Sequence, residues 1–293
     1  MVIATGFFDG VHTGHRLVIE QLVEAARQRG DESMVVTFWP HPRNVLQQEA
    51  YALRLLNASD EKISILKSLG VNHVAVLDFT KEFSSLTMKE YLEQYVVKRF
   101  GGKAVVLGYD NRMGCDSSAP DDVAEVAVQF GLEVIRARMV TSGNDVPVSS
   151  TKIRSELEAG RVDAASSMLG YDYFMTGVVV AGNRIGRTLG FPTANMQLYE
   201  PLKLVPGNGV YFVRVKTVGR EFYGMCNIGG RPTVGPGNAR TIETHIFGLD
   251  ENIYGLDITV TFLRKIRDEV HFGSLELLRE QLEKDRLLCK SFI

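Results

Sequence analysis

The sequence has few cysteines and no long apolar run, and each shortage excludes a class of protein. Its three cysteines, Cys115, Cys226 and Cys289, lie far apart and match no metal-binding spacing, so we expect reduced thiols of a cytoplasmic protein. No apolar run approaches the ~20 residues that a membrane span requires. The first residues already form an apolar strand, so we expect neither a signal peptide nor a membrane partner.

The sequence also lacks a large excess of charge of either sign. The formal net charge of -2 provides no global basic field for nucleic acid. The overall composition, with 45% hydrophobic and 23% charged residues, is typical of a globular protein. At 293 residues the chain is long enough for two domains of ordinary size, and its sequence leaves the oligomeric state open.

The first half alternates short apolar strands with amphipathic helices. Strands are predicted at 2–5, 34–38, 73–77, 103–107 and 132–137, and helices at 16–28, 60–69, 88–100 and 121–130. This order favours an α/β domain, placed at residues 1–170, with a parallel sheet covered by helices on both faces. In such sheets the ligand lies beyond the carboxyl ends of the strands.

The second half has a different sequence pattern, with short strands and no long helices between them. Strand-like stretches at 174–181, 209–218, 221–228, 240–247 and 256–263 are separated by clusters of glycine, proline and asparagine. Leucines at helical spacing follow at 274–289. We therefore expect a small antiparallel β-barrel with a C-terminal helix, in a domain at residues 171–293.

The most informative stretch comes directly after the first strand, where a glycine-rich turn leads into a helix. This layout places an anion at a helix N-terminus. His12 and His15 lie three residues apart, so they present two donors to one anion. We do not expect them to bind zinc, because no third ligand is evident in the sequence. The surrounding residues that we assign to the same site are Gly6, Phe8, Asp9, Gly10 and Gly14.

Two further strand ends of the first half are unusual. The second strand ends at His41 between two prolines, and the fourth ends at Asp110. Because the ends of neighbouring parallel strands meet at one rim, we expect both residues near the histidine segment, although each is equally compatible with a simple turn. Ser150, Thr151 and Arg154 open a later helix and form a second candidate anion site, or merely a capped helix with a basic face.

In the second half, two loops are too rich in glycine, arginine and hydroxyl groups for ordinary turns. The first resembles a phosphate cradle without the Gly-Lys-Ser/Thr of a Walker A loop, and its candidate residues are Gly182, Gly186, Arg187, Thr188, Gly190, Pro192, Thr193 and Asn195. The second loop contains Asn227 and Arg231. Glu243 is an acid within a strand, which indicates either a solvated or a functional carboxylate. Arg267 either contacts a ligand or simply leads into the last helix.

Taken together, these segments resemble the prokaryotic bifunctional riboflavin kinase/FAD synthetase family over nearly the whole chain. Gly6–His15 is similar to the HxGH-type nucleotidyltransferase signature of a Rossmann-like domain. The stretches 38–42 and 148–154 resemble the next landmarks of that domain. The stretch 186–195 resembles the kinase signature, and 227–233 and 243–255 resemble its later pieces. HxGH alone is shared by many nucleotidyltransferases, whereas the Pro-Thr-Ala-Asn segment is far more specific.

The resemblance implies two reactions. Riboflavin and ATP would give FMN in the C-terminal half, and FMN and ATP would give FAD and pyrophosphate in the N-terminal half. It further implies that Thr193 and Asn195 hold Mg²⁺ and phosphate oxygens, that Glu243 takes the proton from the ribityl hydroxyl, and that His12 and His15 act in adenylyl transfer. The remaining candidate residues would bind ATP or flavin.

One segment departs from the family's pattern. After Asp110 the family usually continues with an aromatic residue before glycine, followed by basic residues, whereas this chain has Met113 and Cys115 around Gly114. Two alternatives to a bifunctional enzyme therefore stay open. One is a riboflavin kinase with a weakened adenylyltransferase domain, and the other is a regulatory flavin-binding protein with vestigial sites.

Overall fold

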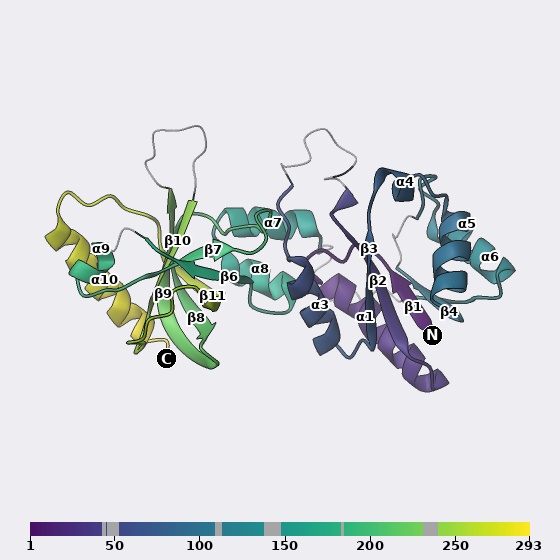
Figure 1. Ribbon diagram of the computed structural model, residues 1–293, viewed down its shortest axis with the longest axis horizontal. Helices are drawn as coiled ribbons and strands as arrows, with labels where there is room; N and C mark the ends of the chain where they lie inside the picture. The colour runs from purple at the N-terminus through teal and green to yellow at the C-terminus, as the bar shows by residue number, and fades with distance from the viewer. Residues whose placement is uncertain (43–44, 46–52, 109–112, 138–147, 183–184, 231–239) are drawn as a thin grey trace. The chain divides into compact units, whose positions relative to one another are not determined.

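The computed structural model describes residues 1–42, 45, 53–108, 113–137, 148–182, 185–230 and 240–293. The chain divides into two compact units, Met1–Ser150 and Thr151–Ile293, each of which is described by itself (Figure 1). Among the described residues, no helix combines the length and the apolar character that crossing a membrane requires. Cys115, Cys226 and Cys289 are free thiols.

The first unit is built on a five-stranded sheet in which all strand pairs are parallel. The strand order is β3-β2-β1-β4-β5. The strands are β1 (Val2–Thr5), β2 (Ser33–Trp39), β3 (His73–Asp78), β4 (Ala104–Leu107) and β5 (Glu133–Arg136). The predicted α/β fold is therefore confirmed. The chain order reverses between β1 and β4, which is the point where sheets of this kind bind ligands.

Helices cover both faces of this sheet, as Figure 1 shows. The helices α1 (Thr13–Arg29) and α3 (Ser59–Ser68) pack on one face. The other elements are α4 (Lys81–Ser84), α5 (Met88–Tyr91), η2 (Leu92–Arg99) and α6 (Pro120–Gln129). The helix predicted at 88–100 is thus a turn of α-helix followed by π-helix, and its buried Leu92 and Val96 pack on Ile3 and Val105 of the sheet.

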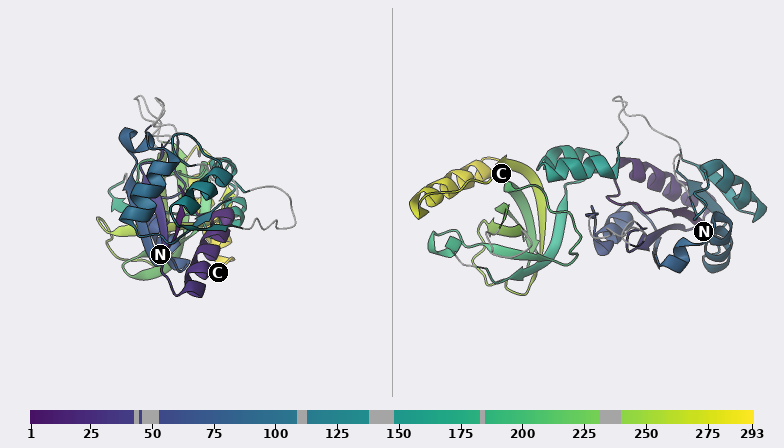
Figure 2. Two further views of the ribbon diagram at one scale, coloured as in Figure 1. Left: turned by 90° about the vertical axis from the view of Figure 1, so that its right-hand side faces the viewer. Right: turned by 90° about the horizontal axis from the view of Figure 1, so that it is seen from above.

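The second unit is a closed antiparallel barrel with strand order β10-β7-β6-β11-β8-β9. Its strands are β6 (Phe174–Val180), β7 (Ala194–Leu198), β8 (Gly209–Thr217), β9 (Arg220–Gly230), β10 (Arg240–Ile246) and β11 (Asp257–Arg267). The short helix α9 (Ile185–Thr188) precedes β7, and α10 (Leu275–Lys290) lies outside the barrel (Figure 2). The barrel and the final helix were predicted, but β7 was not, because the loop predicted there runs through its first residues.

Two helices precede the barrel in the chain and belong to the second unit, except that the first residue of the first helix, Ser150, ends the first unit. They are α7 (Ser150–Glu158) and α8 (Val162–Leu169), of which α8 packs on β11. The backbone N–H of Gly207 donates to the carbonyl of Leu157 at 2.8 Å. The compact units therefore divide at residue 150, about one helix pair before the boundary expected at 170. As a division of functions, that boundary stays a prediction.

Candidate active sites

The segment after β1 forms a tight turn that leads into α1. Three of its residues have positive φ angles: Phe8 at 48°, Gly10 at 84° and Val11 at 36°. For Phe8 and Val11 this backbone conformation is strained, as folded proteins tolerate mainly at functional sites. The turn ends at His12, the N-cap residue of α1, whose Nδ1 accepts a hydrogen bond from the backbone N–H of His15 at 3.4 Å.

The two histidine rings stack at the start of α1, with centroids 3.6 Å apart and planes inclined by 18°. Burial lowers the pKa of His12 to about 4. Burial, followed by the charges of His12 and Lys62, lowers the pKa of His15 well below its usual value. Both imidazoles are therefore neutral near pH 7. Because Nδ1 of His12 accepts a hydrogen bond, its proton lies on Nε2, which can donate to a ligand.

Two glycines make room for these aromatic rings. A Cβ atom at Gly14 would lie 3.3 Å from the His12 ring, and one at Gly6 would lie 3.0 Å from the Phe8 ring. The buried Nδ1 of His15 has no hydrogen-bond partner within the part of the chain that the structure describes. An anionic ligand at the helix N-terminus would complete this arrangement.

Residues distant in sequence hold the turn in place. The Asp9 carboxylate is buried and accepts hydrogen bonds from the backbone N–H groups of Leu56 at 3.1 Å and Asn57 at 3.4 Å. The Ser150 hydroxyl donates to the carbonyl of Asp9 at 2.9 Å. The His41 ring lies 4.0 Å from the ring of Phe7, so the ends of β1 and β2 do meet at one rim.

For three predicted residues of this site, membership stays a prediction. Asp110 falls outside the described residues. Thr151 and Arg154 lie in the first turns of α7, within the second compact unit, so their approach to the histidine pair stays a prediction.

A cavity of about 490 Å³ opens at the same end of the sheet. Its wall includes the aromatic side chains of Phe7, Phe38, Phe79, Phe83 and Tyr91. Met113 and Cys115 line it as well, so the segment that departs from the family's pattern forms part of a built cavity. The backbone N–H of Cys115 donates to the carbonyl of Leu86 at 2.9 Å, which fixes this segment against the wall.

In the second unit, three polar side chains stand side by side on neighbouring strands. Glu243 of β10 is paired directly with Asn195 of β7 on one side and with Asn227 of β9 on the other. Paired residues project from the same face of a sheet, so the carboxylate and the two amides gather there. Ile242 and Thr244, the neighbours of Glu243 in β10, are buried on the opposite face.

The arrangement of Glu243, Asn195 and Asn227 requires glycine at position 182. A Cβ atom there would overlap the carboxamide of Asn195, whose side chain is buried. Gly186 has a similar function, because a Cβ atom there would overlap the carbonyl of Phe191. The backbone N–H of Phe191 donates to the carbonyl of Gly186 at 2.8 Å, so the segment folds into a compact turn, with Gly190 at φ 84°.

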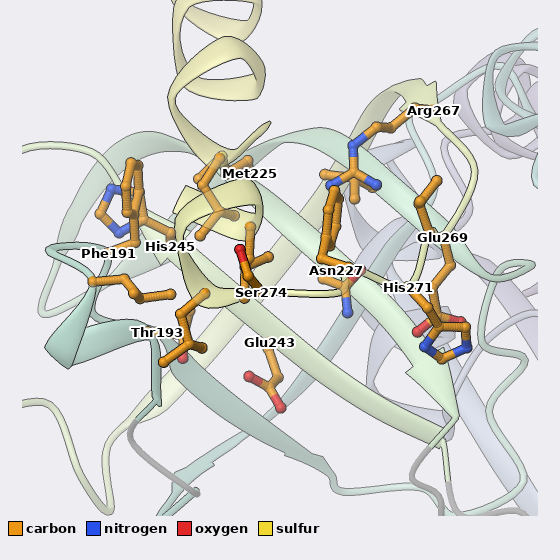
Figure 3. Close-up of a pocket in the computed structure, with 18 of the residues that line it drawn as sticks. Phe191, Thr193, Met225, Asn227, Glu243, His245, Arg267, Glu269, His271 and Ser274 are labelled. Carbon is orange, nitrogen blue, oxygen red and sulfur yellow. The ribbon is translucent and has the colours of Figure 1, made fainter. Parts of the chain in front are cut away.

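Two cavities adjoin this group. The larger, about 590 Å³, is lined by Thr193, Asn227, Glu243 and Arg267 among others, with α10 beside it (Figure 3). The smaller, about 320 Å³, is lined by Arg187, Pro192 and the segment 249–254. Thr193 lines both cavities, so this residue lies between them. Thr188 is exposed on α9, and Arg231 falls outside the described residues.

Comparison with known proteins agrees with this division. The family model described as FAD synthetase matches residues 1–152, and the one described as Riboflavin kinase matches residues 169–293. A "Bifunctional riboflavin kinase/FMN adenylyltransferase" of Bacillus subtilis is 34% identical over 97% of this chain and 90% of its own length. The chain belongs to this bifunctional family.

Further relatives support the assignment. Proteins of the same name are 36% identical in Listeria monocytogenes and 34% identical in Escherichia coli K12, each over 99% of this chain and 92% of the relative. A solved structure titled "Macrolide-efflux Protein from Streptococcus pneumoniae" has a TM-score of 0.90 and 33% identity, covering 99% of this chain and 93% of that one. Its title names a function that does not appear in the names of these relatives.

One predicted ligand contact of the kinase half has a different partner in the structure. The Arg267 guanidinium donates to the buried Asp285 carboxylate of α10, with Nε–Oδ2 at 2.9 Å and Nη2–Oδ2 at 2.7 Å. Arg267 therefore anchors α10 beside the larger cavity, which it also lines. Its contact with a ligand stays a prediction.

Two residues that sequence reasoning did not select belong to these sites. His245 contacts the carbonyl of Pro192 through Nδ1 at 2.8 Å and so holds the segment that carries Thr193. Strand alternation could have indicated it, because it lies two residues after Glu243. Lys62 is buried behind the histidine turn. The sequence could have indicated Lys62, because it lies at helical spacing from the apolar residues Ile65 and Leu66 and so falls on the apolar face of α3.

Proposed function

We propose that this chain makes FMN and then FAD. The second unit phosphorylates riboflavin with ATP, and the first unit adenylylates FMN with another ATP and releases pyrophosphate. The observation that carries the proposal is that each half matched by a family model contains a cavity beside the side chains that its reaction requires.

In the kinase half, Glu243 is the general base. Its carboxylate lines the 590 Å³ cavity, which we assign to riboflavin. There it takes the proton from the terminal ribityl hydroxyl as that oxygen attacks the γ-phosphorus of ATP and ADP leaves. We assign the 320 Å³ cavity to ATP, so the two substrates meet at Thr193, which lines both.

Thr193 and Asn195 are the residues that would hold Mg²⁺. Their hydroxyl and amide oxygens are hard ligands suited to this ion. The absent Cβ of Gly182 leaves the space that the buried Asn195 carboxamide occupies, which supports a specific task for that carboxamide. When bound, Mg²⁺ supplies positive charge to the phosphate oxygens. The protein's own contribution is to orient the hydroxyl, through Glu243 and Asn227, toward the phosphate.

In the adenylyltransferase half, His12 and His15 bind the phosphates of ATP. As neutral imidazoles at a helix N-terminus they donate hydrogen bonds to anionic oxygens. An oxygen of the FMN phosphate attacks the α-phosphorus, the bond to the β-phosphate breaks, and pyrophosphate leaves. Donors that are already in place stabilise the charge that develops on pyrophosphate. Ser150, Thr151 and Arg154 are proposed to add further donors.

The 490 Å³ aromatic cavity is assigned to the flavin ring of FMN. Stacking and burial against aromatic side chains suit a flat tricyclic ring. The presence of this cavity, with Met113 and Cys115 in its wall, supports two activities over the kinase-only alternative.

The proposal is tested by incubating the purified chain with riboflavin, ATP and Mg²⁺ and separating the flavins by chromatography. FMN should form first and FAD should follow. FMN without FAD at long times would instead select the kinase-only alternative. Riboflavin that stayed unconverted would support the alternative of a regulatory flavin-binding protein.

We also propose that the partners of the chain are its small-molecule substrates and that it acts in the cytoplasm. The three free cysteines are compatible with a reducing compartment. Fractionation of cells that express a tagged chain would test the location.

A further inference from the structure

A lysine is buried behind the histidine turn, and in the described part of the chain it has no negatively charged hydrogen-bond partner. Lys62 of α3 is 2% exposed. Its Nζ donates to the carbonyl of Phe7 at 2.9 Å and to the hydroxyl of Thr37 at 3.3 Å, and it lies 4.3 Å from the centroid of the Phe7 ring. Among the described residues, both hydrogen-bond partners of this ammonium group are neutral.

Burying such a charge destabilises a fold unless something compensates for it. Burial lowers the pKa of Lys62 to about 8, although the nearby Asp9 carboxylate opposes the shift. That carboxylate accepts hydrogen bonds from Leu56 and Asn57. A strongly perturbed ionisable group beside a candidate site is more typical of function than of stability.

The contacts of Lys62 join three elements at the site. Its own helix is α3, Thr37 belongs to β2, and Phe7 belongs to the turn that carries the positive φ angles. Thr37 also donates to the Phe7 carbonyl, at 3.1 Å, so this one oxygen holds the turn through two donors. Lys62 is close enough to His15 for its charge to lower the pKa of that imidazole.

We propose that Lys62 is a positioning residue for adenylyl transfer: its ammonium group fixes the turn at Phe7 and supplies a buried positive charge beside the histidine pair. The proposal rests on the adenylyltransferase activity proposed above. The neutral histidines donate hydrogen bonds but carry no charge, whereas a triphosphate is strongly anionic. A cation held in a site of low dielectric attracts that anion more strongly than an exposed one does.

The test compares Lys62→Met with Lys67→Met, since Lys67 is an exposed lysine on the same helix. FAD formation from supplied FMN and ATP should fall about tenfold or more in kcat/KM in Lys62→Met and stay unchanged in Lys67→Met. FMN formation from riboflavin should stay unchanged in both. The thermal midpoint of Lys62→Met should equal or exceed that of the wild type, because methionine removes a buried charge at similar volume.

The pH profile separates the charge from a merely structural role. The groups that face Lys62 are Asp9 in the turn and His15, stacked on His12, in α1, while Glu61 of its own helix accepts from the Ala58 N–H. Wild-type FAD formation should decline as pH rises through about 8, because the ammonium group loses its proton there. Lys62→Met should lack this decline. Lys62→Arg, which keeps the charge but does not titrate, should retain FAD formation without the decline.

Three results would overturn the inference. The first is an unchanged kcat/KM for FAD formation in Lys62→Met. The second is a loss in Lys62→Met that comes with a lower thermal midpoint and an unchanged alkaline decline, and the third is an equal loss in Lys62→Met and Lys62→Arg. Failure of the wild-type chain to make FAD is distinguishable from all of these, and it would overturn the proposed function together with this inference.

Discussion

The two candidate sites of this chain are built in opposite ways. In the first unit, the site is a backbone turn after β1, and contacts from distant segments hold it at Phe7 and Asp9. In the second unit, the site is a row of side chains on paired strands, with Glu243 between Asn195 and Asn227. The first depends on anchors outside its own segment, and the second depends on strand register.

This difference predicts where each site is vulnerable. Shifting β10 by one residue would turn Glu243 toward the barrel core, so the kinase site is as stable as the strand pairing that surrounds it. The turn at Phe8 and Val11 is strained, so it persists only while its anchors hold. The two sites should therefore respond independently to substitutions, and the effects below are ordered from the largest to the smallest.

The largest effect is expected from Glu243→Gln. The amide cannot accept the proton of the ribityl hydroxyl, so FMN formation should fall about 10³-fold. FAD formation from supplied FMN should be unchanged. Both rates can be measured by chromatography of the flavins. A parallel loss of both activities would contradict independent sites.

Acid should destabilise the first unit through His12. Its pKa is about 4 in the folded chain and 6.5 as the usual value, so the unfolded chain takes up a proton first. Stability is then fully present above pH 6.5 and is lost by up to about 3 kcal/mol as pH falls to 4. Hydrogen exchange of the α1 amides at pH 7, 5 and 4 measures this loss.

The matched variant is His12→Asn, because asparagine keeps an N-cap acceptor but does not titrate in this range. It should lose less stability on acidification than the wild type. An identical loss would remove His12 as the cause.

His15→Ala should reduce FAD formation about 100-fold, because one donor to the phosphates is removed. FMN formation should persist at the wild-type rate. His73→Ala serves as the control, since His73 is only partly buried and pairs with Glu32 at the surface. Loss of FMN formation in His15→Ala would show that the two reactions are not divided between the units as proposed.

The smallest effect is expected from Gly182→Ala. The added Cβ would displace the Asn195 carboxamide, so FMN formation should fall about tenfold and require more Mg²⁺. Gly230→Ala is the matched control, because a Cβ atom there meets nothing within 4 Å. Mg²⁺ titrations of the initial rate would distinguish the two variants. An unchanged Mg²⁺ requirement would argue against a role for Asn195 at the metal.

Much of the fold could be predicted from periodicity. For β1 to β5, α1, α3 and α6 the predicted bounds differ from the observed ones by only a few residues at the ends, whereas the short α4 was not predicted. The strand β7 was missed because glycine, arginine and hydroxyl residues extend up to it, and its few residues pair with β6 and β10 only once the barrel closes. The π-helical geometry of η2 is likewise set by packing, which periodicity alone does not reveal.

Site residues, too, were predicted where a local sequence pattern marks them and missed where only tertiary contacts do. His12, His15 and Glu243 were found because a glycine turn or a strand around them is visible locally. Lys62 was not, because its importance comes from burial against Phe7 and Thr37, which belong to other segments. The pairing of Arg267 with Asp285 also depends on where α10 docks, and no local pattern encodes it.

The most direct test of two independent sites mixes two variant chains, each of which should lack one of the two activities. Glu243→Gln and His15→Ala are each supplied with riboflavin, ATP and Mg²⁺, alone and as an equimolar mixture, and the flavins are separated by chromatography. Each variant alone should make little FAD, whereas the mixture should make FAD because FMN formed by one chain is adenylylated by the other. A mixture that makes no more FAD than either variant alone would contradict the account.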